Sequence, residues 1–203
     1  MVTLLGAEGY ELLEKYKLPV APYSIVKNQQ ELDSVIRKFN LPVVLKVISQ
    51  KIIHKTEAGA VKICKTKDEA KIAFKALQKL EGYVLVQKFI EGQMTIIGIK
   101  ADPTFGQVIM FGLGGIMVEI FKDVSFRVCP ITQSDARKMI KELKSYEILK
   151  GVRGQKPINF KLLEDVLVKT SQLAMKENIK ELDMNPFIIN GKQGFAVDVR
   201  VIK

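Results

Sequence analysis

Apolar side chains recur at the spacing of one helical face in four segments of the chain. Two of these segments begin with a capping pair, since Asn28 precedes Glu31, and Thr66 precedes Glu69, by three positions. We therefore expect a short helix after each capping residue and two longer helices at residues 132–144 and 159–176.

Other segments are short, rich in β-branched residues and bounded by turn-forming residues, which favours strands. Two of them flank the turn sequence Asn190–Gln193 and predict a hairpin at the end of the chain. Two others flank Glu91-Gly92, and we expect them to pair as well. The expected strands are residues 41–48, 60–64, 83–90, 95–101, 107–111, 126–131, 181–189 and 194–202.

Together these elements predict an α+β fold of two lobes with mostly antiparallel sheets flanked by helices. The pattern of expected elements changes near residues 82–91, because helices and strands alternate before this segment and several strands follow one another after it. We therefore expect an N-terminal lobe at residues 1–85 and a C-terminal lobe at residues 86–203.

The composition excludes several classes of protein. With 47% hydrophobic and 27% charged residues, the chain can bury a core, which a disordered chain cannot. Its longest uncharged run, Pro103–Val118, contains proline and four glycines and is shorter than the ~18 apolar residues of a membrane-spanning helix. Glutamates near the N-terminus interrupt any export signal, and Cys64 and Cys129 stand apart, without zinc-ligand spacing. We expect a cytoplasmic protein that does not bind a membrane.

The charge and the histidine count narrow the chemistry further. The chain has 32 Lys+Arg and 22 Asp+Glu, a net charge of +10 that suits either nucleic-acid binding or the handling of phosphates. His54 is the sole histidine, so any hydrolase triad or histidine-containing metal site would have to use it. In its basic loop His54 is either a surface residue or a nucleophile that accepts a phosphoryl group.

The terminal hairpin groups oxygen donors on one face. Alternation along a strand places Asp183 and Asn185 on the same side, and a turn at 190–193 brings Asn185 opposite Asp198 and Asp183 opposite Arg200. A carboxylate and an amide on neighbouring strands suit a hard cation such as Mg²⁺ that bridges phosphates. The alternative is a solvated polar face with an Asp183–Arg200 pair.

Several other residues could contact phosphate, and each also has an ordinary structural interpretation. Lys46 stands in an apolar strand, where a charge requires a partner or an anionic ligand unless it reaches water at the strand end. The glycine-rich segment 112–115 either cradles phosphate or makes a tight turn, because it lacks a P-loop ending. Lys122 and Arg127 follow it and could add positive charge.

Taken in order, these segments resemble the ATP-grasp β subunit of the ADP-forming (NDP-forming) acyl-CoA synthetases, the acetate–CoA ligase group related to succinyl-CoA synthetase. The resemblance extends from Glu8 to Val201. An ordered set of motifs is more specific than any one of them. The motifs that carry it are LPVVLKV, IIHKTEAGAV, VQKFIEG, MFGLGGIMVEIFKDVSFRVCPI, ELDMNPFII and AVDVRV.

The resemblance implies an ATP-grasp fold that clamps ATP or ADP between two lobes, with Mg²⁺ on Asn185 and Asp198. It implies that a lysine matching Lys46 holds the phosphates and that adenine meets the backbone of the interlobe strand. It also implies a phosphoryl relay through His54, with Glu119 and Arg127 near the phosphates. The nucleotide-binding positions are then Lys46, Lys55, Gly59, Gln87, Lys88, Phe89, Ile90, Gly114 and Gly115.

In that family the chain works with a CoA-binding α subunit, and we expect an α2β2 heterotetramer that interconverts acyl-CoA, ADP and phosphate with acid, CoA and ATP. Two positions depart from the family pattern: Ala60 replaces a glycine, and Gln93-Met94 replaces an acidic ribose contact. One alternative is another ATP-grasp ligase that acts through an acylphosphate. The other is a non-catalytic nucleotide- or nucleic-acid-binding module, although the lysines are dispersed and not interleaved with aromatics.

Overall fold

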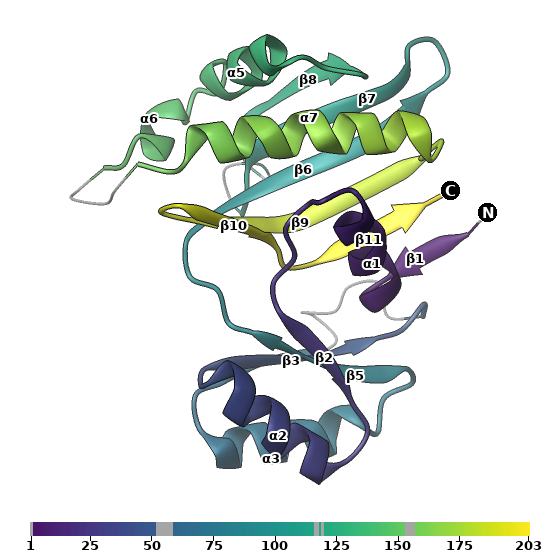
Figure 1. Ribbon diagram of the computed structural model, residues 1–203, viewed down its shortest axis with the longest axis vertical. Helices are drawn as coiled ribbons and strands as arrows, with labels where there is room; N and C mark the ends of the chain where they lie inside the picture. The colour runs from purple at the N-terminus through teal and green to yellow at the C-terminus, as the bar shows by residue number, and fades with distance from the viewer. Residues whose placement is uncertain (1, 52–58, 116–117, 119, 153–156) are drawn as a thin grey trace. The chain divides into compact units, whose positions relative to one another are not determined.

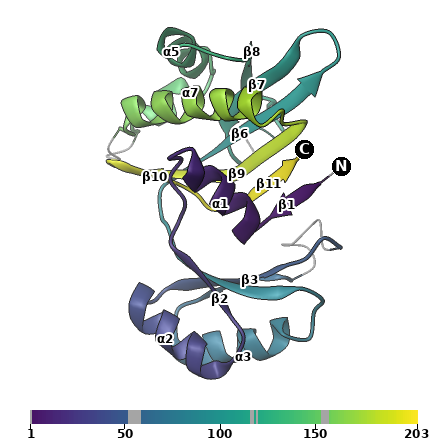
Figure 2. The same ribbon diagram turned by 45° about the vertical axis from the view of Figure 1, so that its right-hand side comes forward.

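The computed structural model of the chain describes residues 2–51, 59–115, 118, 120–152 and 157–203 (Figures 1 and 2). The chain forms two compact units. One combines Met1–Val20 with Ile90–Lys203, and the other is Ala21–Phe89. Both contain antiparallel sheets with helices packed on one face, which confirms the predicted α+β class.

The unit Ala21–Phe89 contains a four-stranded sheet of order β2-β5-β3-β4, and two helices cover one of its faces (Figure 1). Both predicted helix caps are confirmed, because the Asn28 side chain accepts the Glu31 N–H at 2.9 Å and the Thr66 hydroxyl accepts the Glu69 N–H at 3.1 Å. The elements are β2 (Tyr23–Val26), α2 (Gln29–Phe39), β3 (Val43–Ile48), β4 (Val61–Cys64), α3 (Lys67–Leu77) and β5 (Tyr83–Lys88).

The other unit contains a seven-stranded sheet of order β1-β11-β9-β6-β7-β8, with β10 paired to β9. Helices α1, α5 and α7 lie on one face of this sheet (Figures 1 and 2). The elements are β1 (Thr3–Leu5), α1 (Ala7–Lys15), β6 (Gln93–Asp102), β7 (Gly106–Leu113), β8 (Val124–Val128), α5 (Gln133–Lys141), α6 (Tyr146–Leu149), α7 (Phe160–Lys176), β9 (Glu181–Asn190), β10 (Gln193–Ala196) and β11 (Val199–Ile202).

Two details of the predicted chain course differ from the structure. The lobe division was expected at residues 85 and 86, but β1 pairs with β11, so that the first twenty residues lie in the same unit as the last strands. The strands expected to pair across Glu91-Gly92 lie in separate sheets, because β5 pairs with β2 and β3, and β6 pairs with β7 and β9. The segment at Glu91-Gly92 therefore connects two sheets and does not form a hairpin turn.

The helix expected at residues 132–144 ends early, at Lys141. The Asp123 carboxylate accepts the backbone N–H groups of Lys144 at 2.9 Å and Ser145 at 2.8 Å, together with the Ser145 hydroxyl. Burial would raise the pKa of Asp123, but these hydrogen bonds outweigh it and hold the pKa below its ordinary value. The anchored turn separates α5 from α6. None of the described helices is both long enough and apolar enough to cross a membrane.

Candidate functional site

Strand β9 presents a row of polar side chains on the sheet face opposite the helices. Asp183 and Asn185 are exposed, whereas Leu182, which precedes Asp183, and Met184, which lies between the two, are buried. Asp183 stands opposite Arg200 of β11, as the hairpin register predicts. The predicted alternation of β9 is therefore confirmed.

The second half of the hairpin is interrupted where the predicted metal ligands meet. One continuous strand was expected at residues 194–202, but β10 ends at Ala196 and β11 begins at Val199. The pairs on either side of the gap, Ala196 with Phe187 and Val199 with Met184, keep one register. Continuing that register places Asp198 opposite Asn185.

Strand β9 also carries a bulge at Asn185. Thr95 of β6 pairs with Phe187, and Ile97 pairs with Met184, so two residues of β9 face a single residue of β6. We call this segment, Asn185–Pro186, the bulge. Proline has no N–H, so its place in a bulge leaves no ladder donor unused, and bulges commonly re-aim a side chain near a functional site.

The oxygen donors at the bulge are suited to a hard divalent cation. Asn185 supplies an amide oxygen and Asp198 a carboxylate, and Asp183 lies two residues before Asn185. The pKa of the Asp183 carboxyl is raised to about 6, because desolvation by the surrounding protein and the charge of Asp198 raise it by more than Arg200 lowers it, although the residue keeps exposed surface. Two carboxylates that repel each other beside an amide oxygen form a donor set that a cation would stabilise. Among the described residues no group of three or more His, Cys, Asp or Glu could hold a metal, so the site depends on the amide.

Lys46 and Gln87 lie on one face of the four-stranded sheet. Their neighbours Leu45 and Val47 pack in the core beneath α2 and α3, so alternation directs Lys46 to the opposite face. Lys46 is flanked by Leu85 and is 3% exposed, and Gln87 is fully buried. The lysine is therefore enclosed in the sheet and not a strand-end residue that reaches water.

Strand β5 ends at Lys88, and the predicted segment continues beyond it through Phe89 and Ile90. Lys88 is exposed, Phe89 is partly buried and Ile90 is buried. The Lys88 N–H donates to the Pro22 carbonyl at 2.9 Å, so it is already used within the protein. A backbone contact to adenine at this strand would have to use other groups of the predicted segment.

The glycine-rich segment begins within β7, which ends at Leu113, and Gly114-Gly115 follow the strand. The Gly114 N–H donates to the Met94 carbonyl at 3.0 Å, which removes it from the set of phosphate donors. Gly115 has φ 69°, a conformation that favours glycine. Gly59 also has a positive φ, of 65°. The structure thus supports the turn interpretation at Gly114 and allows close approach of a ligand at Gly115.

Arg127 lies on the helix-covered face of its sheet, apart from the oxygen donors. It pairs in register with Ile109, whereas the row that contains Asp183 continues through Gly98 to Phe126. Its guanidinium donates to the Glu142 carboxylate and to the Phe126 carbonyl, and the hydrogen bond to Glu142 raises the pKa of Arg127. The structure therefore does not bring Arg127 together with Asn185.

Three other predicted residues, His54, Lys55 and Glu119, lie outside the described residues. Sequence reasoning also missed two buried hydroxyl groups, those of Tyr10 and Thr95, which bond to the backbone beside the oxygen donors. Their partners lie 187 and 92 residues away along the chain, so no local pattern could have identified them.

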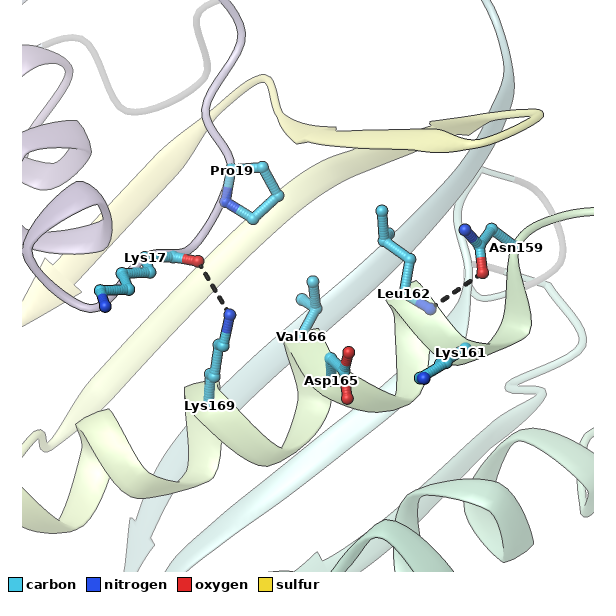
Figure 3. Close-up of a pocket in the computed structure, with 8 residues that line it drawn as sticks. All are labelled: Lys17, Pro19, Asn159, Lys161, Leu162, Asp165, Val166 and Lys169. Carbon is cyan, nitrogen blue, oxygen red and sulfur yellow. Dashed lines mark hydrogen bonds between the residues drawn. The ribbon is translucent and has the colours of Figure 1, made fainter.

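A cavity of about 330 Å³ opens beside α7, on the helix-covered side of the sheet (Figure 3). Its three lysines do not converge, because the Lys17 side chain extends away from the other lining residues and Lys169 donates to the Lys17 carbonyl at 3.3 Å. The cavity contains none of the predicted site residues. It is lined by Lys17, Pro19, Asn159, Lys161, Leu162, Asp165, Val166 and Lys169.

Comparison with known proteins gives matches along nearly the whole chain. A family model described as an ATP-grasp domain matches residues 2–202. The β subunit of ADP-forming acetate–CoA ligase I from Pyrococcus furiosus is 42% identical, over 98% of this chain and 91% of that protein. ADP-forming acetate–CoA ligase I from Archaeoglobus fulgidus is 40% identical, over 98% of this chain but only 31% of that longer protein.

The fold matches solved structures equally well. Acetyl-coenzyme A synthetase 1 of Ca. Korarchaeum cryptofilum, in complex with coenzyme A, Ca-AMPCP and HgCl⁺, has a TM-score of 0.92 at 35% identity, over 98% of this chain and 93% of that chain. Another structure of that protein holds coenzyme A and Mg-AMPPCP, with its phosphohistidine segment pointing towards the nucleotide-binding site. Its TM-score is 0.86 at 36% identity, over 98% of this chain and 92% of that chain.

Proposed function

The chain belongs to the ATP-grasp family, among the nucleotide-binding subunits of the ADP-forming acid–CoA ligases, and we propose that it exchanges a phosphoryl group between ADP and a phosphohistidine on a CoA-binding partner. With that partner, acyl-CoA, ADP and phosphate are converted to acid, CoA and ATP. The observation that carries the proposal is the pair of oxygen donors, Asn185 and Asp198, that one register sets opposite each other on the sheet face away from α1, α5 and α7.

Asn185 and Asp198 would hold Mg²⁺ through one amide and one carboxylate oxygen. When bound, the cation supplies positive charge to phosphate oxygens, which lowers the repulsion between a phosphoryl donor and ADP. Asp183 lies beside this pair and stands opposite Arg200, so the site carries two carboxylates and one guanidinium.

Lys46 would bind the phosphates of the nucleotide. Lys46 is 3% exposed, and a charge that is largely withdrawn from water interacts more strongly with a phosphate than the charge of an exposed lysine does. Gln87 lies on the same sheet face and offers an amide for a polar part of the nucleotide.

His54 would carry the phosphoryl group between the two subunits. In the first step the P–N bond on the partner's histidine breaks as a P–N bond to the imidazole of His54 forms. In the second step that bond breaks as an oxygen of the terminal phosphate of ADP attacks phosphorus. Each transfer leaves one imidazole free and consumes no other reactant, so positioning and charge neutralisation supply the catalysis.

The CoA-binding and acid-binding steps would occur on the partner, in an α2β2 assembly. The chain matches nearly all of a relative named as a β subunit but about a third of a longer ligase. We infer that the remaining functions of the longer ligase correspond to the partner subunit here.

The test is to follow ³²P from both directions. With γ-labelled ATP and the CoA-binding partner, wild-type protein should acquire acid-labile, base-stable label, and His54→Asn should block label transfer to the partner. When the reaction starts from acetyl-CoA, ADP and labelled phosphate and contains the His54→Asn variant, the partner should still become labelled. No labelled ATP should form. If His54→Asn supports ATP formation at the wild-type rate, or neither chain is ever labelled, the proposal is wrong.

A further inference from the structure

A buried tyrosine forms a hydrogen bond with the backbone between β10 and β11. The Tyr10 hydroxyl, on α1, donates to the Val197 carbonyl at 2.5 Å, and the Val197 N–H donates to the Pro186 carbonyl at 3.0 Å. Val197 directly precedes Asp198, and Pro186 directly follows Asn185. One chain of hydrogen bonds thus connects α1 to the backbone beside both oxygen donors.

A second buried hydroxyl fastens β9 just beyond the bulge. Thr95 donates from Oγ1 to the Phe187 carbonyl at 2.8 Å, and Thr95 and Phe187 are both fully buried. Because the register between β6 and β9 changes at the bulge, the regular ladder does not set the direction of Asn185 by itself. The Thr95 bond fixes the backbone where the ladder resumes.

Both hydroxyls occupy positions that apolar side chains of the same shape could fill. Tyr10 and Thr95 have no exposed surface, and a buried hydroxyl costs free energy unless it is hydrogen-bonded. Each makes its bond to a carbonyl within two residues of Asn185 or Asp198. The hydroxyls therefore act on the one segment of the sheet where the two donors face each other.

We propose that Tyr10 and Thr95 are positioning residues for the divalent cation held by Asn185 and Asp198. By fixing the backbone on both sides of the interruption, the two hydroxyls set the spacing of the donor oxygens before the cation binds, so that less ordering is required on binding. The inference rests on the proposed function, because it requires a cation at these donors. Outer partners of metal ligands typically change affinity by about 10- to 100-fold.

The experiment measures Mn²⁺ binding to the full chain by electron paramagnetic resonance of the free ion, with and without ADP. Tyr10→Phe and Thr95→Val should each weaken Mn²⁺ binding by about 5- to 50-fold, although neither removes a ligand. Thr95→Ser keeps the hydroxyl and should bind within about twofold of wild type. Asn185→Ala and Asp198→Ala each remove a donor oxygen, and their Mn²⁺ binding is the reference for complete loss of the site.

Two matched controls separate positioning from a general loss of stability. Thr170→Val removes a buried hydroxyl that donates to the Val166 carbonyl at 2.8 Å within α7, and Tyr16→Phe removes a partly buried hydroxyl that donates to Glu177 at 2.8 Å. Both should lower the thermal midpoint and leave Mn²⁺ affinity unchanged. The Tyr10 and Thr95 variants test the proposal separately, so one that does not fold leaves the other to decide.

Two negative results are distinguishable. If Mn²⁺ binding by the wild type does not depend on Asn185 and Asp198, the cation site of the proposed function fails, and the inference fails with it. If that dependence is present but Tyr10→Phe and Thr95→Val bind Mn²⁺ as tightly as wild type, or lose no more affinity than the controls, only the positioning roles are overturned.

Discussion

Lys46 is enclosed within β3, with an exposed fraction of 3%, in a strand whose other residues are all apolar. At so low an exposure the ammonium interacts with other charges more strongly than a lysine in water does, which supports the phosphate contact that we propose for it.

We expect Lys46→Met to separate stability from nucleotide binding. Methionine fills a similar volume without a charge, so the variant should still fold, and its free energy of unfolding, measured in urea, reports any structural loss. The dissociation constant for ADP, measured by calorimetry, should increase at least about tenfold, because a charge-assisted phosphate contact is lost. Lys75→Met, at an exposed position on α3, is the matched control. A variant that loses stability but binds ADP normally would contradict this role.

Arg127 illustrates a limit of sequence reasoning at the same scale. A basic residue after a glycine-rich segment suggests a phosphate contact, but a shift of one position along a strand reverses the face to which a side chain points. The register of β8 directs Arg127 to Glu142 on the helix-covered side, and Phe126 to the face that carries Asp183. Only the pairing of β8 with β7 determines this, and that pairing is not encoded in the motif.

At the scale of elements, Glu177 joins the ends of two helices and of the chain. It is the C-cap residue of α7, and its carboxylate accepts from Lys15 at 2.9 Å, Tyr16 at 2.8 Å and Lys203 at 2.6 Å. The hydrogen bond from Lys203, followed by those from Lys15 and Tyr16, lowers the pKa of Glu177 to about 2. Without these partners a negative charge at a helix C-terminus would be unfavourable.

This cluster should make stability depend on pH in a defined direction. The folded-state pKa lies below the unfolded value, so the contribution is fully present above about pH 4.5 and is lost as the pH falls through about 2. Glu177→Gln should lower the free energy of unfolding by about 1–2 kcal/mol at pH 7, since the lysine partners are partly solvated. The difference from wild type should shrink steadily in urea titrations between pH 5 and pH 2.5.

The matched control is Glu81→Gln, which removes an ion pair to Lys51 whose side chains are 65% and 75% exposed. Such a pair should contribute less than about 0.5 kcal/mol at any pH. A difference between Glu177→Gln and wild type that stays constant down to pH 2.5 would show that the carboxylate charge is not the source of the stabilisation.

Elements defined by neighbouring residues were predictable, and pairings between distant ones were not. The caps at Asn28 and Thr66 act over three residues, so the sequence alone located both helices. The separation of β5 from β6, and the early end of α5 caused by Asp123, depend on contacts between distant segments. The same distinction applies to the site, since the register of a short hairpin predicted Asn185 opposite Asp198, whereas Tyr10 could be found only in the fold.

At the scale of the whole molecule, the net charge of +10 left nucleic-acid binding open. The basic residues are distributed over helices in both units, including Arg37 and Lys38 in α2, Lys75 in α3, and Lys138 in α5. Acidic residues accompany them, as where Arg137 pairs with Glu164 at 3.0 Å. This arrangement favours a surface on which most basic residues are solvated and a few bind phosphate. It does not favour a continuous binding site for a polynucleotide.

Salt dependence distinguishes these two uses of charge. Polynucleotide binding depends on released counterions, so the affinity of the chain for a duplex, measured by fluorescence anisotropy, should fall at least about tenfold between 50 and 200 mM KCl. Mg²⁺-dependent ADP binding, measured by calorimetry, should change by less than about threefold over the same range, because an enclosed ammonium and a cation site are weakly screened. Lys46→Met should remove ADP binding and leave the weak duplex binding intact. If the duplex still binds more tightly than ADP at 200 mM KCl, the charge serves nucleic acid and the phosphate-handling interpretation of Lys46 must be abandoned.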